Sequence, residues 1–436
     1  MRAIKMILAF ALPLFLNVQG FAQTGTILLS PAAKAEVIDN LSSALLQNYI
    51  FPDTARRMND FIRQQLKSGA YKRINSPNEF AKAITTDLYS VYKDLHLSVT
   101  YNPSLGTDFK RESYIDAIAK KMQFEKQQNY GFTKAEILPG NVGYVALNRF
   151  FDINERSAET VKSVFSFLRN TDAMIIDLRY NGGGQDMMVK YICSYFFKER
   201  THMNDMYERR TNQVYQYWTE PVNQSSIFSS MPVYILVNAQ TYSGAEEFAY
   251  DMQSAHRAII IGQTTGGAAH PNSPVNISNG FTGYIPYARS INPVTKTNWE
   301  TKGVIPDIGT SSNNALDMAR VRFYDDLIST SKDSATIQSA IWMRKVLLSK
   351  LHPGLIMPQL LKKYAGNYSG SKVSFENGNI YFTPSDGYKD ILITVSPTEF
   401  AFNTWKFDFV KNKEGSITEL IMTPLNGNTQ ILKRQK

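Results

Sequence analysis

The sequence predicts an α/β (α+β) core between an N-terminal helical domain and a small C-terminal antiparallel β domain. Three patterns support this: helical spacing of apolar residues near the N-terminus, β-branched runs alternating with helical stretches in the middle, and alternating runs at the end. The expected parts are a signal peptide at 1–22, the helical domain at 23–125, the core at 126–330, a helical linker at 331–364 and the β domain at 365–436.

The N-terminal helices are expected because apolar residues recur at spacings of three and four. The runs that show this are AAKAEVIDNLSSALLQNYI, TARRMNDFIRQQLKSG and SPNEFAKAITTDLYSVYKDL. Asp53 and Ser76-Pro77 supply cap and first-turn residues before two of these runs. The spacing and the caps together favour helices over strands here.

The middle and the end of the chain have a different texture. The runs VGYVAL, AMIIDLRY, PVYILVN and RAIIIG are short, rich in β-branched residues and separated by helical stretches. Such alternation is typical of an α/β layer. The last seventy residues or so carry alternating apolar runs with Asn-Gly, Ser-Asp-Gly and Lys-Glu-Gly turns between them. These turns predict hairpins, and hence a small barrel or sandwich. The segment LLKKYAGNYSGSKVSFENGNIYF resembles small β accessory domains of bacterial exported hydrolases, which implies a structural or substrate-positioning role.

The first residues resemble a secretory signal peptide. Arg2 and Lys5 precede the apolar run MILAFALPLFLNV, and Gly20-Phe21-Ala22 offers a small-residue cleavage site. The run is shorter than the roughly 20 residues of a membrane-spanning helix. We therefore expect cleavage near Gln23 and a periplasmic or secreted product without stable membrane insertion; an uncleaved signal anchor is the alternative.

Charge and cysteine content narrow the class of protein. The 436 residues carry a formal charge of +9, which becomes +7 once Arg2 and Lys5 are subtracted. The positive residues are scattered and form no stripe with interleaved aromatics, so we expect no nucleic-acid partner. Cys193 is the only cysteine, which excludes an intrachain disulfide.

Ser243 is the first candidate for chemistry. The strand PVYILVN is followed by AQTYSGAEEFAYDM, so a tight turn should present the Ser243 hydroxyl at the start of a helix. Backbone N–H groups at that helix start could stabilise an oxyanion. Ser243 and Glu246 also fit a capping box, in which the serine would be structural.

A second turn, DLRYNGGGQDMM, also leads from a strand into a helix. Its glycines, Gly182 to Gly184, allow close backbone approach and could direct an N–H towards a ligand. A plain strand-to-helix turn and a phosphate cradle are the alternatives. Neither phosphate-binding motif is matched, which weakens the second of these.

A serine nucleophile needs a base, because its hydroxyl ionises too weakly at neutral pH. His96, in YKDLHLSVTY, lies where a helix gives way to an extended stretch. His270, in TTGGAAHPN, is the runner-up, and a structural role is the alternative for either. Glu300, in TNWETKGVIPDI, could orient the base unless it is an exposed loop residue.

Metal and cofactor chemistry is not expected from these motifs. There is no HExxH, no paired cysteine and no pair of histidines four residues apart. We therefore predict no metal and no cofactor.

Six collinear segments resemble the tail-specific or C-terminal processing serine peptidase family, and within it the interphotoreceptor retinoid-binding protein-like and tricorn-like branch. They are KDLHLSV, NYGFTKAEILPGNVGYVALNRF, AMIIDLRYNGGG, VYILVNAQTYSGAEEFAY, IIIGQTTGGAAHP and NWETKGVIPDI. The resemblance implies that Ser243 is the nucleophile and that the N–H groups of Gly183 and Gly244 form the oxyanion hole. No segment resembles the PDZ module of processing peptidases.

The resemblance also bears on the base. Family members with a serine–lysine pair carry lysine where this chain has Ala268. The tricorn-like plan then implies His96 as base and Glu300 as the third catalytic member. That branch has a serine directly before its histidine, whereas Leu95 stands here, so Ser98 or a water is an alternative relay.

These observations predict an exported serine hydrolase, most simply a peptidase, that cleaves peptide bonds through an acyl-enzyme on Ser243. Its partner would be a peptide or protein substrate, and the oligomeric state is left open. Two alternatives remain: a non-catalytic module that binds apolar ligands or peptides on the same fold, and a serine esterase.

Overall fold

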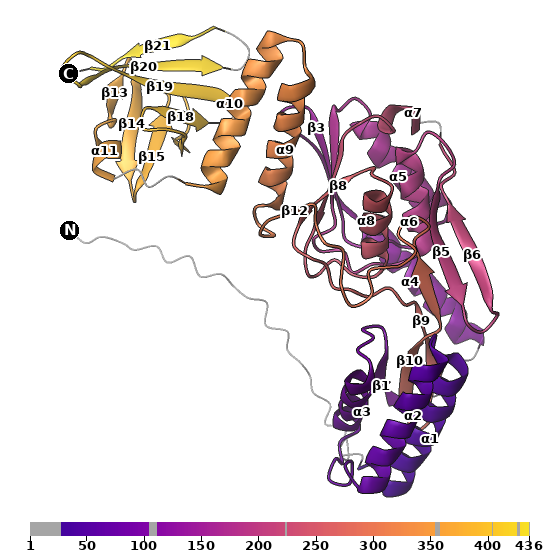
Figure 1. The fold of residues 1–436 in the computed structure, drawn as a ribbon. Coiled ribbons are helices and arrows are strands. Elements are labelled where there is room, and N and C mark those ends of the chain that lie inside the picture. The colour runs from indigo at the N-terminus through magenta and orange to yellow at the C-terminus, as the bar shows by residue number, and fades with distance from the viewer. Residues whose placement is uncertain are drawn as a thin grey trace.

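A computed structural model describes residues 28–103, 111–222, 225–353, 358–402, 404–424 and 428–435. The expected signal peptide at 1–22 lies outside these residues. Every helix within them is too short or too polar to span a bilayer. The molecule is elongated, with the N-terminal helices at one end, the α/β core in the middle and the C-terminal sheets at the other end (Figure 1).

Three helices and one strand form the N-terminal unit: α1 (Pro31–Asn48), α2 (Pro52–Ser68), α3 (Pro77–Val91) and β1 (Ser98–Tyr101). Each helix begins with a proline, whose fixed φ suits the first turn, and Ser30 and Ser76 cap α1 and α3. β1 pairs with β10 (Phe281–Pro286), which pairs with β9 (Asn272–Asn276). The unit therefore shares a sheet and a hydrophobic core with a segment from much later in the chain.

The core is a six-stranded sheet in the order β12-β8-β7-β4-β3-β2. All its pairs are parallel except that of β2 with β3. Its strands are β2 (Phe132–Leu138), β3 (Val142–Leu147), β4 (Ala173–Asp177), β7 (Val233–Val237), β8 (Ile259–Gly262) and β12 (Ile308–Gly309). β4 and β7 are fully buried neighbours, so the turns that follow them meet at one edge, where ligands bind in such sheets.

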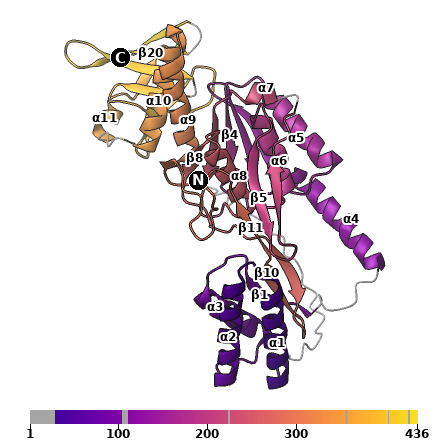
Figure 2. The same ribbon diagram turned by 45° about the vertical axis from the view of Figure 1, so that its right-hand side comes forward.

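Helices cover both faces of this sheet (Figure 2). The helices that pack on one face are α5 (Glu155–Leu168), α6 (Asp186–Cys193) and α8 (Gly244–Ser254). The helices on the other face are α9 (Ala315–Thr330) and α10 (Ser334–Leu351). The remaining helices are α4 (Arg111–Gln127), η2 (Asn129–Gly131), η3 (Ser194–Phe196) and α7 (Ser225–Phe228). A separate sheet, in the order β11-β5-β6, contains β5 (His202–Glu208), β6 (Gln213–Trp218) and β11 (Ala288–Ile291).

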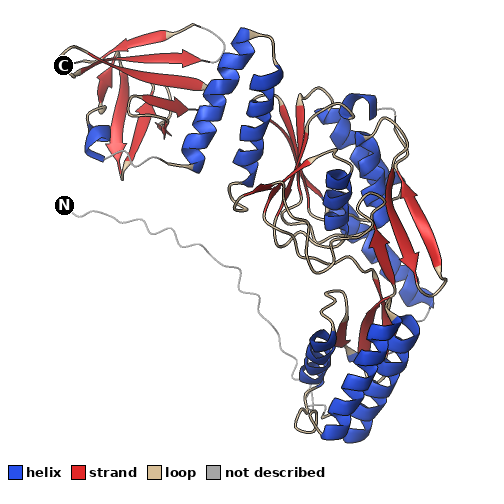
Figure 3. Cartoon of the chain, viewed as in Figure 1, coloured by secondary structure: helices blue, strands red, loops and turns tan. Residues whose placement is uncertain are grey.

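The C-terminal part is built from two antiparallel sheets beside α10 (Figure 3). The first contains β13 (Gly366–Tyr368), β14 (Ser371–Glu376), β15 (Asn379–Thr383) and β16 (Asp390–Ile391). The second contains β17 (Ile393–Thr394), β18 (Glu399–Phe402), β19 (Trp405–Lys411), β20 (Ile417–Pro424) and β21 (Gln430–Lys433). The short helix α11 (Pro358–Lys362) precedes them. Asn377 and Gly378 both have positive φ between β14 and β15, as a tight hairpin turn requires.

The predicted fold class is thus confirmed: a helical N-terminal region, a mixed α/β core and C-terminal antiparallel sheets. The one addition is the sheet that β1 shares with β10, which ties the N-terminal helices to the core.

Phe281→Ala tests that tie. The Phe281 ring is fully buried and lies 5.8 Å from the ring of Phe80 and 5.0 Å from that of Tyr101, measured between centroids. Because truncation leaves a cavity between the helices and β10, we expect a loss of about 3–5 kcal/mol in unfolding free energy. Guanidinium denaturation followed by circular dichroism measures it. Phe167→Ala, at an exposed ring, is the control and should change little; equal losses in the two variants would contradict the account.

Candidate active site

Ser243 occupies a strained turn between β7 and α8. Its φ of 54° and ψ of −123° are sparsely populated by non-glycine residues, and such strain concentrates at functional sites. The side chain makes no cap hydrogen bond. Instead, Ser243 Oγ lies 3.1 Å from His96 Nε2. The turn therefore presents the hydroxyl to an imidazole, which a capping role does not require.

Glu246 holds this turn in place. Its carboxylate is fully buried and accepts hydrogen bonds from the Ser243 N–H (2.8 Å), the Gly267 N–H (2.6 Å), the Ala268 N–H (2.9 Å) and the Thr265 hydroxyl (2.5 Å). Burial raises the pKa of Glu246, and these hydrogen bonds oppose the rise. The Glu246 side chain thus links the Ser243 turn to the loop at 265–268. This link stabilises the strained backbone of Ser243.

His96 reaches the site from the N-terminal unit, just before β1. Its backbone N–H donates to Asp94 Oδ1 (3.1 Å), and its carbonyl accepts from Asn272 Nδ2 (2.6 Å). Its ring lies against that of Tyr242, with centroids 5.2 Å apart. Burial lowers the pKa of His96 to about 4, because the charged form is desolvated; Asp94 opposes this and His270 adds to it. The neutral imidazole is thereby favoured, as a general base requires.

The glycine turn after β4 approaches Ser243 closely. A Cβ on Gly183 would lie 2.6 Å from the Tyr242 carbonyl oxygen and 2.8 Å from Ser243 Cβ, so only glycine fits there. The Gly183 N–H is already engaged, because it donates to Asn181 Oδ1 at 2.8 Å.

Gly184 and Gly244 offer a different pair of donors. A Cβ on Gly244 would lie 3.1 Å from the Gly184 nitrogen, so the two backbones are in close contact. Within the described ranges neither N–H has a hydrogen-bond acceptor. Both residues line the same cavity as Ser243 and His96. Gly244 is also the first residue of α8, where N–H groups lack partners within the helix.

The cavity in front of Ser243 has a volume of about 520 Å³. Besides the four residues already named, its walls come from α6, α8, the sheet β11-β5-β6 and the loops at 268–272 and 299. A space of this size accommodates a substrate side chain together with the adjoining backbone.

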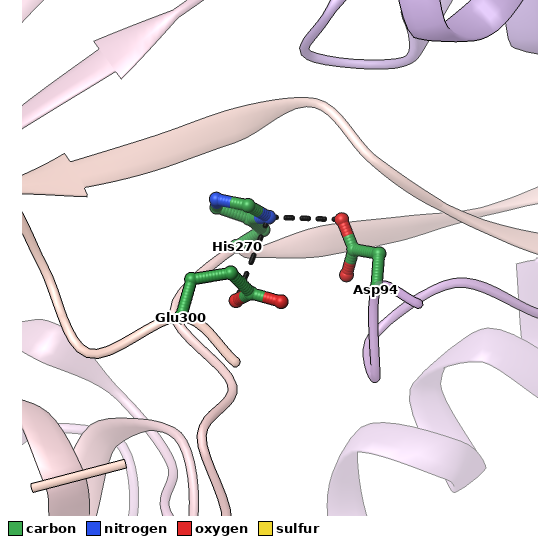
Figure 4. Close-up of side chains that lie close together, drawn as sticks. All are labelled: Asp94, His270 and Glu300. Atoms are coloured by element: carbon green, nitrogen blue, oxygen red, sulfur yellow. Dashed lines mark hydrogen bonds and ion pairs between the residues drawn. The ribbon is translucent and has the colours of Figure 1, made fainter. Parts of the chain in front are cut away.

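Asp94, His270 and Glu300 form a buried cluster (Figure 4). His270 Nδ1 lies 2.8 Å from Asp94 Oδ2 and 3.5 Å from Glu300 Oε2, so an N–H at Nδ1 can donate to both carboxylates. Asp94 also accepts from the Tyr49 hydroxyl at 3.0 Å. Asp94 therefore connects the N-terminal helices, the His96 backbone and the His270 loop.

Glu300 lies in this cluster and not beside His96. Its Oε2 accepts from the Ala269 N–H at 2.6 Å, and its buried Oε1 has no hydrogen-bond partner. Burial raises the pKa of Glu300 to about 7, with His270 opposing the shift and Asp94 adding to it. Among the described residues no hydrogen bond or ion pair joins Glu300 to His96, and His96 Nδ1 has no partner.

The same three side chains are the described group whose donor atoms could hold a metal ion, since these atoms lie within 4.8 Å of one another. Coordination through His270 Nδ1 would require that nitrogen to be deprotonated. Its short contact with Asp94 instead fits an N–H held between carboxylates.

The sequence-predicted residues thus divide into two groups. Ser243, His96 and Gly244 meet at the cavity, whereas Glu300 and the runner-up base His270 meet around Asp94. Sequence reasoning did not single out Asp94. The signal was available in KDLHL, where an acidic side chain stands two residues before the histidine in an otherwise apolar stretch.

Two family models match the chain. A model of peptidase family S41 matches residues 141–310, and a model described as the N-terminal domain of this peptidase in eukaryotic IRBP matches residues 19–131. The chloroplastic carboxyl-terminal-processing peptidase 2 of Arabidopsis thaliana is 27% identical over 178 residues. That match covers 39% of this chain and 33% of the relative, so about a third of the relative's length is shared.

Solved structures give weaker likenesses. The photosystem II D1 C-terminal processing protease is 17% identical, with 65% of this chain and 94% of that chain covered and a TM-score of 0.42. A lipoprotein from Streptococcus agalactiae is 13% identical, with 69% and 98% covered and a TM-score of 0.47. The tricorn protease is 12% identical, with 66% and 35% covered and a TM-score of 0.39. Identities this low carry no information about the chemistry of this chain.

Asp94→Ala should destabilise the protein by about 2–5 kcal/mol, because it leaves the buried Tyr49 hydroxyl, His96 N–H and His270 ring without their acceptor. Guanidinium denaturation measures the loss. Asp53→Ala removes a carboxylate at the exposed start of α2 and is the matched control, with an expected change within about 0.5 kcal/mol. An Asp94 variant as stable as this control would show that the cluster is not structural.

Proposed function

The chain belongs to peptidase family S41, and from this premise we propose that it is a serine peptidase that cleaves peptide bonds through an acyl-enzyme on Ser243. The observation that carries the proposal is the 3.1 Å contact between Ser243 Oγ and His96 Nε2, made from a strained turn that is itself bonded to Glu246. A nucleophile within hydrogen-bond reach of its base is the arrangement that acyl transfer needs.

In the first step His96 Nε2 accepts the proton of Ser243 Oγ as the oxygen attacks the substrate carbonyl. The negative charge moves to the carbonyl oxygen. We assign the Gly184 and Gly244 N–H groups as its donors, because both face the cavity and neither has another acceptor among the described residues. The Gly183 N–H, bonded to Asn181, is left to shape the turn.

In the second step the proton on His96 Nε2 passes to the leaving amine, and the peptide bond breaks. The substrate's acyl group is then an ester of Ser243. His96 next takes a proton from water, whose oxygen attacks the ester through a second tetrahedral intermediate held by the same donors. Return of the proton to Ser243 Oγ releases the acid and restores the enzyme.

Asp94, His270 and Glu300 act in this scheme as positioning residues. Asp94 fixes the His96 backbone, and Glu300 fixes the Ala269 N–H at the cavity wall. Glu300 thus has a positioning role and makes no direct contact with the His96 imidazole.

The substrate would be a peptide or protein, and the protein would be exported after removal of its signal peptide. The C-terminal sheets lie beyond α9 and α10, on the far side of the core from the N-terminal helices (Figure 1). We therefore give them a structural or substrate-positioning role and no part in the chemistry.

Ser243→Ala should abolish both peptide hydrolysis and covalent labelling by a fluorophosphonate, and His96→Ala should lower kcat by about three to six orders of magnitude, because the alkoxide is no longer generated. Hydrolysis of quenched peptides and mass spectrometry of the labelled protein measure these effects. Ser329→Ala, at an exposed position on α9, is the matched control.

The outcomes separate the alternatives. Undiminished labelling of Ser243→Ala would overturn the nucleophile assignment. Labelling of Ser243 with hydrolysis of esters but not of peptides would favour an esterase. A Ser243 that is never labelled, in a chain that still binds peptides, would favour a non-catalytic binding module.

The acid limb of the pH profile should reflect the lowered pKa of His96. Because only the neutral imidazole accepts the Ser243 proton, and its pKa is about 4, kcat/KM for a peptide with a neutral residue on the acyl side of the scissile bond should be nearly constant from about pH 5.5 to 7 and should fall below about pH 4. Initial rates with a quenched peptide, alongside circular dichroism to verify folding, measure this. Glu300→Gln should leave the midpoint in place; a midpoint at 6.5 or above in the unaltered protein would contradict the assignment.

A further inference from the structure

The cavity beside Ser243 contains carboxylates that the mechanism does not use. Glu247 follows Ser243 by four positions, so it lies one helical turn along α8 on the same face. Glu247, Ser243 and Gly244 line the same cavity. Gly244, three positions before Glu247, has no side chain to separate this carboxylate from the nucleophile.

Glu247 is a buried residue of the cavity wall and does not lie on the exposed surface. Only 7% of the residue is exposed, and its Oε1 accepts from Asn204 Nδ2 at 3.0 Å. Within the described part of the chain, Oε2 has no hydrogen-bond partner, although Glu247 lines the cavity. One carboxylate oxygen is therefore available to a bound group.

Among the described residues, no cationic side chain pairs with the Glu247 carboxyl group. Asp251, on the next turn of α8, is also buried and accepts from Asn292, an uncharged amide. Ion pairs between the described residues include none to Glu247 or Asp251. Burial, and to a lesser degree the charge of Asp186, raises the pKa of Glu247 to about 8, so the protonated carboxyl is favoured at neutral pH and a bound cation would favour the ionised form. A buried carboxylate without a cationic partner is costly, and such groups concentrate at functional sites.

The other charged walls have the same sign. Asp186, at the start of α6, and Glu208, at the end of β5, also line the cavity, and none of the described lining residues is a lysine or arginine. Two arginines of the neighbouring segments are engaged elsewhere. Arg289 lies over the rings of Phe51 and Tyr207, and Arg210 donates to Asn48. The local field is thus negative in a chain whose net charge is +9.

Aromatic side chains complete the walls. They are Tyr215, Tyr217, Tyr287 and Trp299. Burial raises the pKa of Tyr217, and the nearby Asp186 carboxylate adds to the rise. Aromatic faces attract ammonium and guanidinium groups and pack against their methylene stems.

Resting on the proposed function, we propose that this cavity binds a lysine or arginine side chain of the substrate residue whose carbonyl Ser243 attacks. Glu247 is the specificity-determining residue, and Asp186 and Glu208 are further acidic residues of the cavity wall. The enzyme then cleaves on the carboxyl side of basic residues. An acidic or a small neutral substrate side chain is not expected in this cavity, because neither would offer Glu247 a countercharge.

Quenched peptides that differ at one position test this selectivity. The residue on the acyl side of the scissile bond is lysine, arginine, norleucine or glutamate, and mass spectrometry locates the cleavage. In the unaltered protein kcat/KM for lysine should exceed that for norleucine by about 10-fold or more, with glutamate poorest. Glu247→Gln keeps the size and the bond to Asn204, and should lower the lysine-to-norleucine ratio by about 10-fold. Norleucine cleaved as well as lysine, or an unchanged ratio in Glu247→Gln, would overturn the proposal.

Two further variants provide a control and a substitute for Glu247→Gln. Glu199→Gln removes an exposed carboxylate outside the cavity and should leave the ratio unchanged. If Glu247→Gln does not fold, Asp186→Asn, at a half-buried wall position, should lower the same ratio in the same direction.

A binding measurement separates this proposal from the proposed function. By calorimetry, Ser243→Ala should bind benzamidine at least about 10-fold more tightly than the neutral benzamide, and the added change Glu247→Gln should remove the difference. Equal binding would overturn the cation site. Cleavage of the norleucine peptide without any cation preference would leave the peptidase standing and reject the site. Benzamidine binding that depends on Glu247, in a protein that is never labelled and never cleaves peptides, would support the cation site and reject the peptidase.

Discussion

The contact between Ser243 Oγ and His96 Nε2 joins residues 147 positions apart, and the rest of the site depends on the packing that brings them together. His96 belongs to the N-terminal helical unit, whereas Ser243 lies at the edge of the core sheet. The pairing of β1 with β10 and the bond from Tyr242 to the Leu95 carbonyl bring the two parts into register. A small relative shift of the two units would break the contact, so docking of the helices is a condition for the proposed catalysis.

Polar contacts around Ser243 keep its backbone in the strained conformation. A non-glycine residue at φ 54° relaxes unless its surroundings prevent it. Glu246 supplies that restraint from one side, and the close approach of Gly183 supplies it from the other. The side chain that sequence analysis placed in a capping box thus anchors the nucleophile turn.

The sequence was sufficient for the fold class and for proposing Ser243 and His96 as the reacting pair, because these depend on local patterns. Periodicity marks the helices and strands, and a strand-to-helix turn marks Ser243. The proposed oxyanion donor rests instead on which glycine N–H already has an acceptor: the Gly183 N–H donates to Asn181, and sequence patterns do not show such a bond.

Long-range pairing was also beyond the sequence. Asp94 and His270 are 176 positions apart, and only the folded chain shows that the histidine proposed as an alternative base faces a carboxylate. Glu300 follows the same logic, since its sequence position suited a role beside His96 while its side chain lies against His270 and Ala269. The acidic character of the cavity likewise arises from residues on different elements.

The most direct test of the account is a crystal structure of the protein inactivated by a peptidyl diphenyl phosphonate. The account predicts a covalent bond from Ser243 Oγ to phosphorus, with the phosphoryl oxygen about 2.7–3.1 Å from the Gly184 and Gly244 nitrogens. A phosphoryl oxygen bound elsewhere, or a phosphonate attached to a residue other than Ser243, would contradict it.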